Sequence, residues 1–398
     1  MGLSEELKTT EVSSYGVALY RLPDGYLDDD LEQKLSKYLD RGGVAQFFRD
    51  QLNRRLAEVD LMPKGKVTIR LIDIQGFSDT LDLAKSLVAL LNTLPWQYTL
   101  YVRGPAGFFA GTAQCPLEVA INDRFGLVSP HKLAKAKFTT GIPSLDEWLW
   151  RGSLTVRERG KSLNWIYFYF KATGYIPDVS YNFTVDEFEA EIRSFFGCCI
   201  ATNKVFPFED YQSNYQTFVV FHTCGSDNII RPAGSLSTDV YQALHFAVTE
   251  ELLTRFRSSA RLTEKLNDII GAMSLKGDAK LRTAATWIFR SGSRGTPLDR
   301  VLETTIALEV LLGDRSMSDK VGLTRLMSNR CAYALGTSDT DRREIMKNFE
   351  DFYGLRSQIV HTGKLHVDDS HETLIDWAVE TASSVFKYEL GLVPRNGT

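Results

Sequence analysis

An arginine and a histidine are separated by four residues in the run Arg356-Ser-Gln-Ile-Val-His361. An imidazole exchanges a proton near neutral pH, and a guanidinium matches phosphate oxygens with its planar fork. Together they could act on a phosphate group, with the histidine moving a proton and the arginine stabilising negative charge on the phosphate oxygens. The spacing alone has little weight, because chance gives about one such match in a chain of this composition. A second match runs from Arg124 to His131, but Gly126 and Pro130 lie within it, so it cannot occupy one helix.

The setting of Arg356 is more informative than the spacing. Ile345, Phe349, Phe352 and Arg356 recur at intervals of four, three and four residues, which places the guanidinium on the apolar stripe of its helix. A similar apolar seam on the preceding helix contains Glu309. A charge in such a seam needs a partner, so we expect an ion pair between Arg356 and Glu309. The alternative is that this pair only locks two helices together.

His361 follows Arg356 by five residues, a rotation of about 140° around a helix. Both side chains can reach one ligand only where the helix ends at a cleft or at a symmetric interface. The run Thr362-Gly363 supplies such a helix end. We therefore expect a homodimer through the C-terminal helices, with a site that two copies share.

Composition is that of a globular protein with two or three domains. Hydrophobic residues make up 43% of the 398 residues and charged residues 24%, which argues against disorder and fibrous repeats. No apolar run is long enough to span a membrane, and the polar N-terminus does not resemble a secretory signal. Five cysteines, an odd number, do not indicate a disulfide framework. We therefore expect a cytoplasmic protein.

The net charge of −4 does not mark the whole chain as a nucleic-acid binder, so any basic surface must be local. One segment, 276–300, has a surplus of cations that could contact RNA phosphates. Its candidate RNA-binding residues are Lys276, Lys280, Arg282, Arg290 and Arg294. A solvated helix face explains the same composition.

Periodicity divides the chain into three regions. We predict a mixed α/β domain at 1–150, a β-rich region at 151–235 and an all-helical domain at 236–398, which makes an α+β protein. The expected strands are 67–74, 97–103, 163–171 and 217–221, and the expected N-terminal helices are 78–91 and 184–196. The expected C-terminal helices are 238–256, 260–274, 278–291, 297–312, 319–335, 340–361 and 371–390. Thr296 with Pro297, Gly313 and Ser370 are the predicted helix ends.

Three other patterns favour ordinary structural roles. Gly160-Lys161-Ser162 lacks the first glycine of a phosphate-binding loop and precedes a strand rather than a helix. The cysteines and histidine at 198, 199, 222 and 224 match no metal-ligand spacing, and buried thiols in a sheet are the better interpretation. The aromatic run 165–170 could stack bases, but it more often fills a core on both faces of a sheet. We expect neither a metal nor a cofactor.

Two phrases in the C-terminal part resemble a known family. The run from Asp299 to Leu312 contains Ala307-Leu-Glu309 followed by Leu311-Leu312, and about forty residues later comes Tyr353-Gly-Leu-Arg-Ser-Gln-Ile-Val-His361. This order resembles the Apea-like branch of the HEPN superfamily over roughly 287–390. In many relatives a glycine directly follows the histidine, whereas here Thr362 stands there and Gly363 comes next.

The resemblance implies a helical bundle that acts as a metal-independent RNA endonuclease and homodimer, in defence or toxin–antitoxin systems. It places the catalytic pair at Arg356 and His361, and we add Glu309, Ser357 and Tyr353 as supporting residues. The N-terminal regions are then expected to sense or restrain, and an antitoxin, a trigger or a phage protein is a possible partner. Two alternatives stay open. The helical domain could bind nucleic acid or nucleotide, or only dimerise, without catalysis, or the enzyme could lie in the N-terminal domain.

Overall fold

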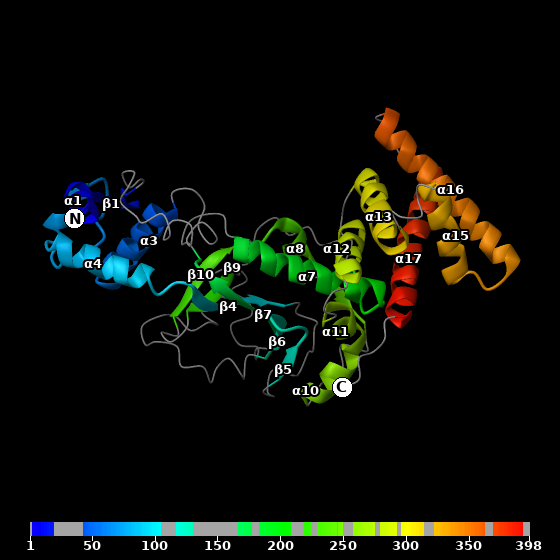
Figure 1. Cartoon of the computed structure of the whole chain (residues 1–398), viewed down its shortest axis with the longest axis horizontal. Coiled ribbons are helices and arrows are strands. Elements are labelled where there is room, and N and C mark those ends of the chain that lie inside the picture. Colours follow the sequence, from blue (N-terminus) through cyan, green and yellow to red (C-terminus); the bar gives the residue numbers. More distant parts are fainter. Residues whose placement is uncertain are drawn as a thin grey trace. The chain divides into compact units, whose positions relative to one another are not determined.

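The protein is an α+β protein with a helical C-terminal region, as expected (Figure 1). The structure is a computed structural model that describes residues 2–19, 43–104, 117–129, 166–176, 183–207, 219–224, 229–244, 246–249, 258–274, 279–292, 296–313, 322–362 and 369–392. Contacts group the chain into two compact units built from discontinuous segments. One unit comprises 1–99, 172–184 and 222–234, and the other comprises 100–171, 185–221 and 235–398. The three-region division at 150 and 235 stays a prediction.

The first unit packs three helices against a small sheet. The helices are α1 (Gly2–Thr9), α3 (Gly43–Glu58) and α4 (Thr80–Leu91). In the sheet, β1 (Glu11–Ser13) lies between β2 (Gly16–Val17) and β3 (Ile69–Arg70) and is antiparallel to both. Leu7, Phe47, Leu52 and Leu87 are fully buried in its core. Asp50 is also buried there, where it accepts hydrogen bonds from Gln46 Nε2 at 2.7 Å and Tyr175 Oη at 2.8 Å.

The predicted strand at 67–74 is wrong over most of its length. Only Ile69 and Arg70 pair as a strand, and a turn of 3₁₀ helix follows at Leu71–Asp73. Arg70 closes this turn by pairing with Asp73 at 3.0 Å, three residues later. Leu71 and Ile74, also three residues apart, are both buried. The β-favouring residues of this segment predict a strand, but their burial at a three-residue spacing fits a turn of 3₁₀ helix.

The predicted helix at 78–91 is confirmed as α4, with Asp79 rather than Ser78 at its start. The Asp79 carboxylate accepts a hydrogen bond from the Asp82 N–H at 3.0 Å, as an N-cap does.

A six-stranded sheet has the order β10-β9-β4-β7-β6-β5. Its strands are β4 (Trp96–Arg103), β5 (Glu118–Ala120), β6 (Phe125–Val128), β7 (Tyr167–Gly174), β9 (Val219–Cys224) and β10 (Ile229–Ser235). The predicted strand at 97–103 is confirmed by β4. The strand predicted at 163–171 is found as β7 from Tyr167 onward, and 163–165 lie outside the described residues. The strand predicted at 217–221 is found as β9 from Val219 onward, and 217–218 lie outside the described residues.

The aromatic strand β7 fills a core, as predicted. Tyr167, Phe168, Tyr169 and Phe170 are all buried, while Trp165 lies outside the described residues. Helix α7 (Phe183–Ala201) covers the phenylalanine side of the strand. The ring of Phe168 lies 5.2 Å from that of Phe195, and the rings of Phe170 and Phe188 stack at 5.5 Å. These rings explain the aromatic run without base stacking.

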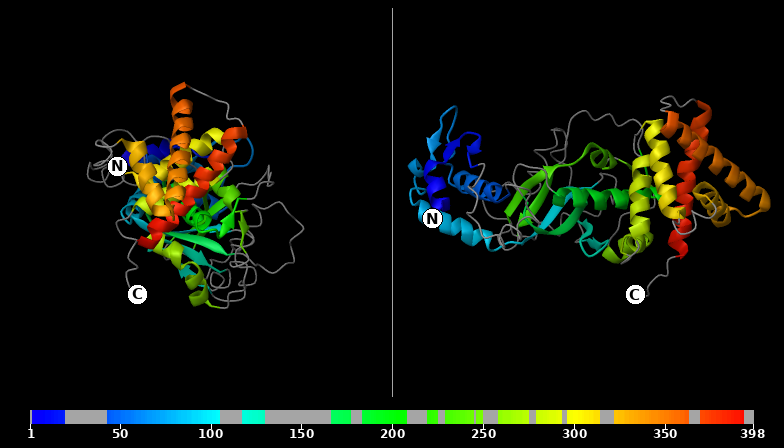
Figure 2. Two further views of the ribbon diagram at one scale, coloured as in Figure 1. Left: turned by 90° about the vertical axis from the view of Figure 1, so that its right-hand side faces the viewer. Right: turned by 45° about the horizontal axis from the view of Figure 1, so that its top comes forward.

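Helices dominate the chain after residue 235. Among the described residues they are α8 (Thr238–Ala243), α10 (Ser259–Lys265), α11 (Asn267–Ser274), α12 (Ala279–Gly292), α13 (Pro297–Leu312), α15 (Leu323–Leu335), α16 (Asp339–Thr362) and α17 (Asp369–Leu392). Helices α12, α13 and α17 pack against one another, and α15 and α16 form a helical hairpin (Figure 2). The predicted helices from 278 onward are confirmed with small shifts of their ends, and the one predicted at 260–274 is broken between α10 and α11.

The helix predicted at 238–256 is wrong at 246–249, and 250–256 lie outside the described residues. A short strand, β11 (Ala247–Val248), follows α8 and pairs with β8 (Val205–Phe206). The reason is tertiary, because Phe246 packs its ring 5.6 Å from Phe196 and 6.1 Å from Phe289. A helical path would carry Phe246 away from this aromatic cluster.

The ends of α13 follow the predicted local chemistry. Thr296 and Asp299 form a capping box around Pro297, and Gly313 ends the helix. A Cβ on Gly313 would lie 2.3 Å from the Glu309 carbonyl oxygen, so glycine is required there. By contrast, α17 begins at Asp369, so Ser370 lies inside the helix and is not its N-cap.

Candidate functional site

The buried face of α16 carries Arg356, as the apolar spacing predicts. Phe349 and Phe352 are fully buried on this face, and Arg356 is half-buried one turn later. The Nε atom of Arg356 is buried and has no hydrogen-bond partner among the described residues. Buried guanidinium nitrogens are almost always bonded, so this one calls for an explanation.

The expected ion pair between Arg356 and Glu309 is wrong. Within the described part of the chain, no ion pair joins the two side chains, and Glu309 instead accepts a long hydrogen bond from the Tyr353 hydroxyl at 3.5 Å. The same hydroxyl lies 3.6 Å from the Met327 sulfur. Tyr353 precedes Arg356 by three residues and so occupies the same face of α16. It therefore stands where the arginine was expected to meet the carboxylate.

Tyr353 is held neutral by this position. Its ring is buried and stacks on Phe349 at 5.0 Å. Burial and the nearby Glu309 carboxylate raise the pKa of Tyr353 above its ordinary value, and the Arg356 guanidinium opposes this effect only in part. Glu309, Tyr353 and Arg356 thus form one small polar group inside the helical region.

His361 has a different environment from Arg356. It lies in the last turn of α16 and is exposed. Ser357 is also exposed, and Val360 is 48% exposed. The rotation of about 140° between the two side chains agrees with one being half-buried and the other exposed. The structure thus places the polar group around Tyr353 on one face of α16 and the imidazole on another.

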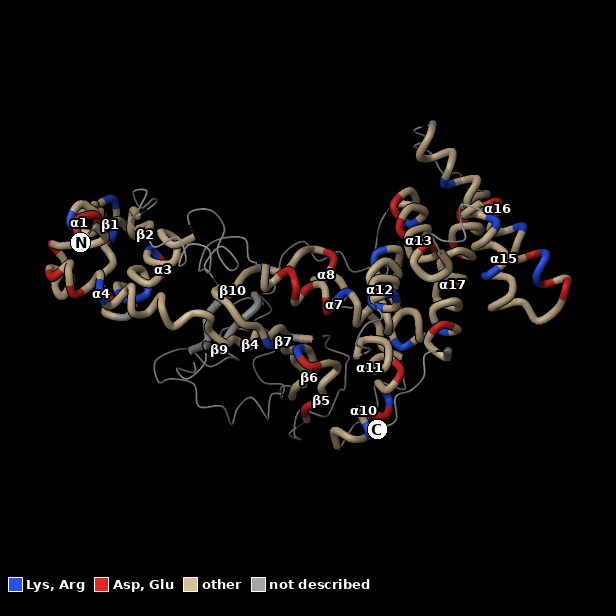
Figure 3. The backbone as a smooth tube through the Cα atoms, in the orientation of Figure 1, with Lys and Arg blue, Asp and Glu red and all other residues tan. Residues whose placement is uncertain are grey.

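The predicted RNA-binding cations are engaged within the protein where the structure describes them. Lys280 pairs with Glu389 of α17 at 2.9 Å, and Arg282 pairs with Glu191 of α7. Arg290 lies over the Trp287 ring, with 4.9 Å between its Cζ atom and the ring centroid. Lys276 and Arg294 lie outside the described residues. Charges of both signs are mixed along α13 and α16, whereas the charged residues of α12 are all Lys or Arg (Figure 3).

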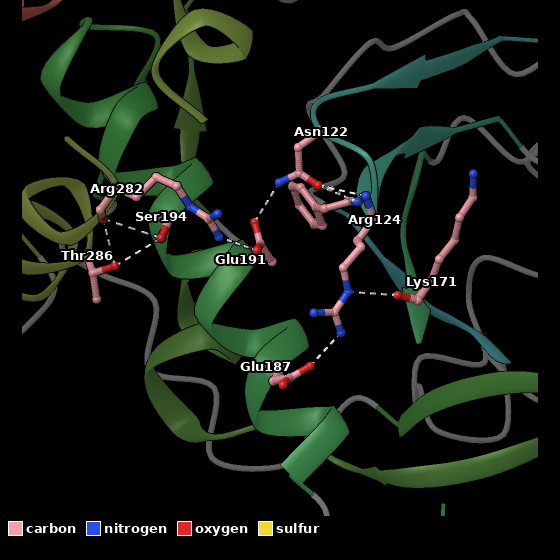
Figure 4. A network of polar contacts seen from close by, with 9 residues as sticks. Asn122, Arg124, Lys171, Glu187, Glu191, Ser194, Arg282 and Thr286 are labelled. Carbon is pink, nitrogen blue, oxygen red and sulfur yellow. Dashed lines mark hydrogen bonds and ion pairs between the residues drawn. The ribbon is translucent and has the colours of Figure 1, made fainter. Parts of the chain in front are cut away.

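Sequence reasoning did not anticipate the ion pairs that hold α7. Arg282 reaches Glu191 from α12, and Asn122 donates to the other oxygen of Glu191 at 3.0 Å (Figure 4). Further along α7, Arg124 pairs with Glu187 at 2.5 Å and lies over the Phe170 ring. These partners come from segments far apart in the sequence, so no local spacing indicates them.

A second network, around Arg193 of α7, is more deeply buried. Arg193 donates to Asp239 at 2.7 Å, to Glu189 at 2.9 Å and to the Ser237 hydroxyl at 2.7 Å. The carboxylate of Glu189 also accepts from the Ser237 N–H at 2.6 Å. The Arg193 guanidinium and the hydroxyl of Ser237 hold the pKa of Asp239 at about 2. This network joins α7 to the start of α8.

Glu303 of α13 is a carboxyl that titrates near neutral pH, and sequence reasoning missed it. Burial raises its pKa to about 7, with Asp299 and Asp239 adding to the rise and Arg290 opposing it. It lies about 120° around α13 from Glu309, so it belongs to another face of the helix. Its neighbours come from three helices, and no motif in the sequence signals them.

The remaining candidate motifs do not form a site among the described residues. Cys198 and Cys199 are buried thiols, as predicted, but they lie on α7 rather than in a sheet. No group of three or more His, Cys, Asp or Glu side chains in the described ranges is placed to hold a metal ion. The run Gly160-Lys161-Ser162 lies outside those ranges. None of the described helices is both long enough and apolar enough to cross a bilayer.

No protein-family model matches the chain, and the comparisons with curated proteins and with solved structures gave no match either.

Proposed function

We propose that the helical region is a metal-independent RNA endonuclease of the HEPN type, with Arg356 and His361 as its catalytic residues. The observation that carries the proposal is the buried, unpartnered Nε of Arg356, five residues before an exposed histidine at a helix end. Within the described residues no carboxylate forms an ion pair with Arg356, so its guanidinium, whose planar fork suits phosphate oxygens, is proposed to meet an external anion. The resemblance of 299–312 and 353–361 to Apea-like HEPN proteins supports the same assignment.

The proposed reaction needs only proton transfer and charge stabilisation. The 2′-oxygen of the RNA bonds to phosphorus as the 5′-oxygen of the next nucleotide leaves. One imidazole accepts the 2′-hydroxyl proton, and a second donates a proton to the departing oxygen. Arg356 faces the pentacoordinate phosphate as its negative charge grows. The products are a 2′,3′-cyclic phosphate and a 5′-hydroxyl end.

The proposal includes a homodimer through the C-terminal helices. Two imidazoles are required, and each copy supplies one exposed His361, about 140° from its own Arg356. A two-fold axis near the end of α16 would bring two Arg356 and His361 pairs to one cleft. Mass in solution tests this, and a monomer that cleaves RNA at full rate would exclude the shared site.

The other parts of the chain take a regulatory role in this proposal. The residues before 236 would act as a sensor or restraint on the helical region, as in a defence or toxin system. An antitoxin, a trigger molecule or a phage protein would be the partner. Comparing RNA cleavage by the full chain before and after addition of phage lysate tests this role, and equal rates would argue against it.

Purified protein is expected to cleave RNA in EDTA, because neither catalytic role requires a metal ion. The measurement is incubation with total RNA, with and without EDTA, followed by analysis of the new ends. Cyclic phosphate and 5′-hydroxyl ends are expected under both conditions. Activity that EDTA abolishes and magnesium restores would exclude the mechanism.

A second candidate is a HEPN-type domain that binds nucleic acid or nucleotide without cutting it. The half-buried Arg356 and the exposed His361 lie on different faces of α16, which favours this candidate because cleavage needs both groups at one ligand. RNA that is bound but stays intact in the same incubation would support it.

A further inference from the structure

One stripe of exposed side chains runs along α15. Arg325, Asn329 and Tyr333 recur every four residues and are all exposed, with Tyr333 76% accessible. Residues at this spacing lie one above another on a helix. Most of the helix surface between them is buried, and Met327, Ser328 and Cys331 have no accessible area. Among the described residues, no hydrogen bond, ion pair or ring contact joins any of these three side chains to another residue.

The charge of α15 differs from that of its neighbours. Its sequence, from Leu323 to Leu335, contains two arginines and no acidic residue. Arg330 donates to the Leu312 carbonyl oxygen at the end of α13, at 2.9 Å. Arg325 thus remains as the arginine of the helix that faces solvent. By contrast, the described cations predicted to bind RNA, on α12, are occupied inside the protein.

The contacts of α15 fix the height of the stripe along the proposed catalytic helix, while the stripe itself lies on the side of α15 away from Met327. Residues 336–338 join α15 to α16 as a helical hairpin, so the two helices are antiparallel. The contact between Met327 and Tyr353 fixes their register. Arg325, two residues before Met327, is then level with about residue 355 of α16. His361 lies six residues further, about 9 Å along the helix axis.

We propose that the stripe Arg325, Asn329 and Tyr333 binds single-stranded RNA and leads it to His361. Tyr333 offers a face on which a base can stack, and Arg325 offers a cation for a phosphate nearer the cleavage site. Asn329 lies between them and can bond a base edge. Arg325 and Tyr333 are about 12 Å apart along the axis, so the stripe spans several nucleotides. This inference rests on the proposed function for its substrate, but binding can be measured without cleavage.

The test measures binding of a fluorescein-labelled oligouridylate to the full chain in a His361→Ala background, by fluorescence anisotropy. Tyr333→Ala is expected to raise the Kd about tenfold, because a stacked base is lost. Tyr333→Phe retains the ring and should stay within about twofold of its parent. Arg325→Ala should also lower the slope of log Kd against log salt by about 0.7, as the loss of one phosphate contact does. Lys387→Ala removes an exposed cation of α17 and serves as the matched control, with no expected change.

Cleavage assays in the otherwise unchanged protein separate this inference from the proposed function. If wild-type protein cleaves RNA through His361 and Tyr333→Ala leaves its KM unchanged, the stripe is not the RNA site while the nuclease proposal stands. If wild-type protein binds RNA through Tyr333 but does not cut it, the inference that the stripe binds RNA is supported and the nuclease proposal fails. A dimer that Tyr333→Ala dissociates, with unchanged RNA affinity, would assign the stripe to a second copy and overturn the inference.

Discussion

His361→Ala is expected to lower the rate of RNA cleavage in EDTA by about 10²–10⁴-fold, the usual contribution of general acid–base catalysis. Its thermal stability should stay close to that of the wild type. The imidazole is exposed in the last turn of α16, and surface substitutions of this kind usually change the free energy of unfolding by less than about 0.5 kcal/mol. Cleavage and melting temperature, measured on the same preparation, check both halves of the expectation.

Val360→Ala is the matched control for His361→Ala. Val360 precedes the histidine in the same turn and is 48% exposed, but it has no group that could transfer a proton. It should cleave RNA at the wild-type rate. Arg356→Lys tests the other role, because lysine keeps the positive charge and loses the planar fork. A His361→Ala protein that cleaves as fast as the Val360→Ala control would remove His361 from the mechanism.

Local chemistry made several helix ends predictable from the sequence. Thr296, Pro297 and Asp299 form their capping box within four residues, so its partners are visible without a fold. The position of Arg356 on a buried stripe was equally visible, because a helix repeats its faces every 3.6 residues. Periodicity and capping are properties of one segment, and here they located α13 and α16 to within a few residues.

Partners from distant segments could not be predicted in the same way. The sequence shows Glu309 and Arg356 on two apolar seams, but the axial register of the helices decides which side chain meets the carboxylate. The register places Tyr353 there. In the same way, Lys280 and Arg282 form a basic run in the sequence, and only the packing of α17 and α7 against α12 brings acidic partners to them.

Secondary structure itself depended on tertiary contacts at two places. The segment at 244–249 has a helical pattern, yet Phe246 joins the cluster of Phe196 and Phe289, and Ala247 pairs with Phe206. At 69–74 the buried residues Leu71 and Ile74 face one core with a spacing of three, which a 3₁₀ turn satisfies and a strand does not. In both places packing overrides local propensity.

Arg193→Met is expected to lower the free energy of unfolding by about 3–5 kcal/mol, the usual cost of removing one partner from a buried ion pair. The Arg193 side chain is 14% exposed and that of Glu189 is 6% exposed. Methionine keeps the packing of the long side chain but leaves Glu189 and Asp239 without their common cation. Urea denaturation followed by circular dichroism measures the change.

Arg124→Met supplies a matched control, because the partner of Arg124 lies on the same helix, α7, as Arg193. Arg124 also pairs with a glutamate of α7, Glu187, but both side chains are about half exposed. Exposed ion pairs contribute about 0–1 kcal/mol, so this substitution should cost much less than Arg193→Met. Equal losses in the two variants would mean that burial does not decide the strength of these pairs.

The loss of unfolding free energy in Arg193→Met should also depend on pH, over a range that the pKa of Asp239 sets. Its pKa is about 2 in the folded protein against an ordinary 3.8, so the unfolded chain binds more protons between these values. The stabilisation that this pairing gives is therefore complete above about pH 4 and is lost as the pH falls through 2. In Arg193→Met the guanidinium that lowers this pKa is absent. Wild type and variant should consequently differ most near neutral pH and converge in stability toward pH 2. A difference that stays constant from pH 7 to about 2 would show that Arg193 stabilises the α7–α8 junction by packing rather than by its charge.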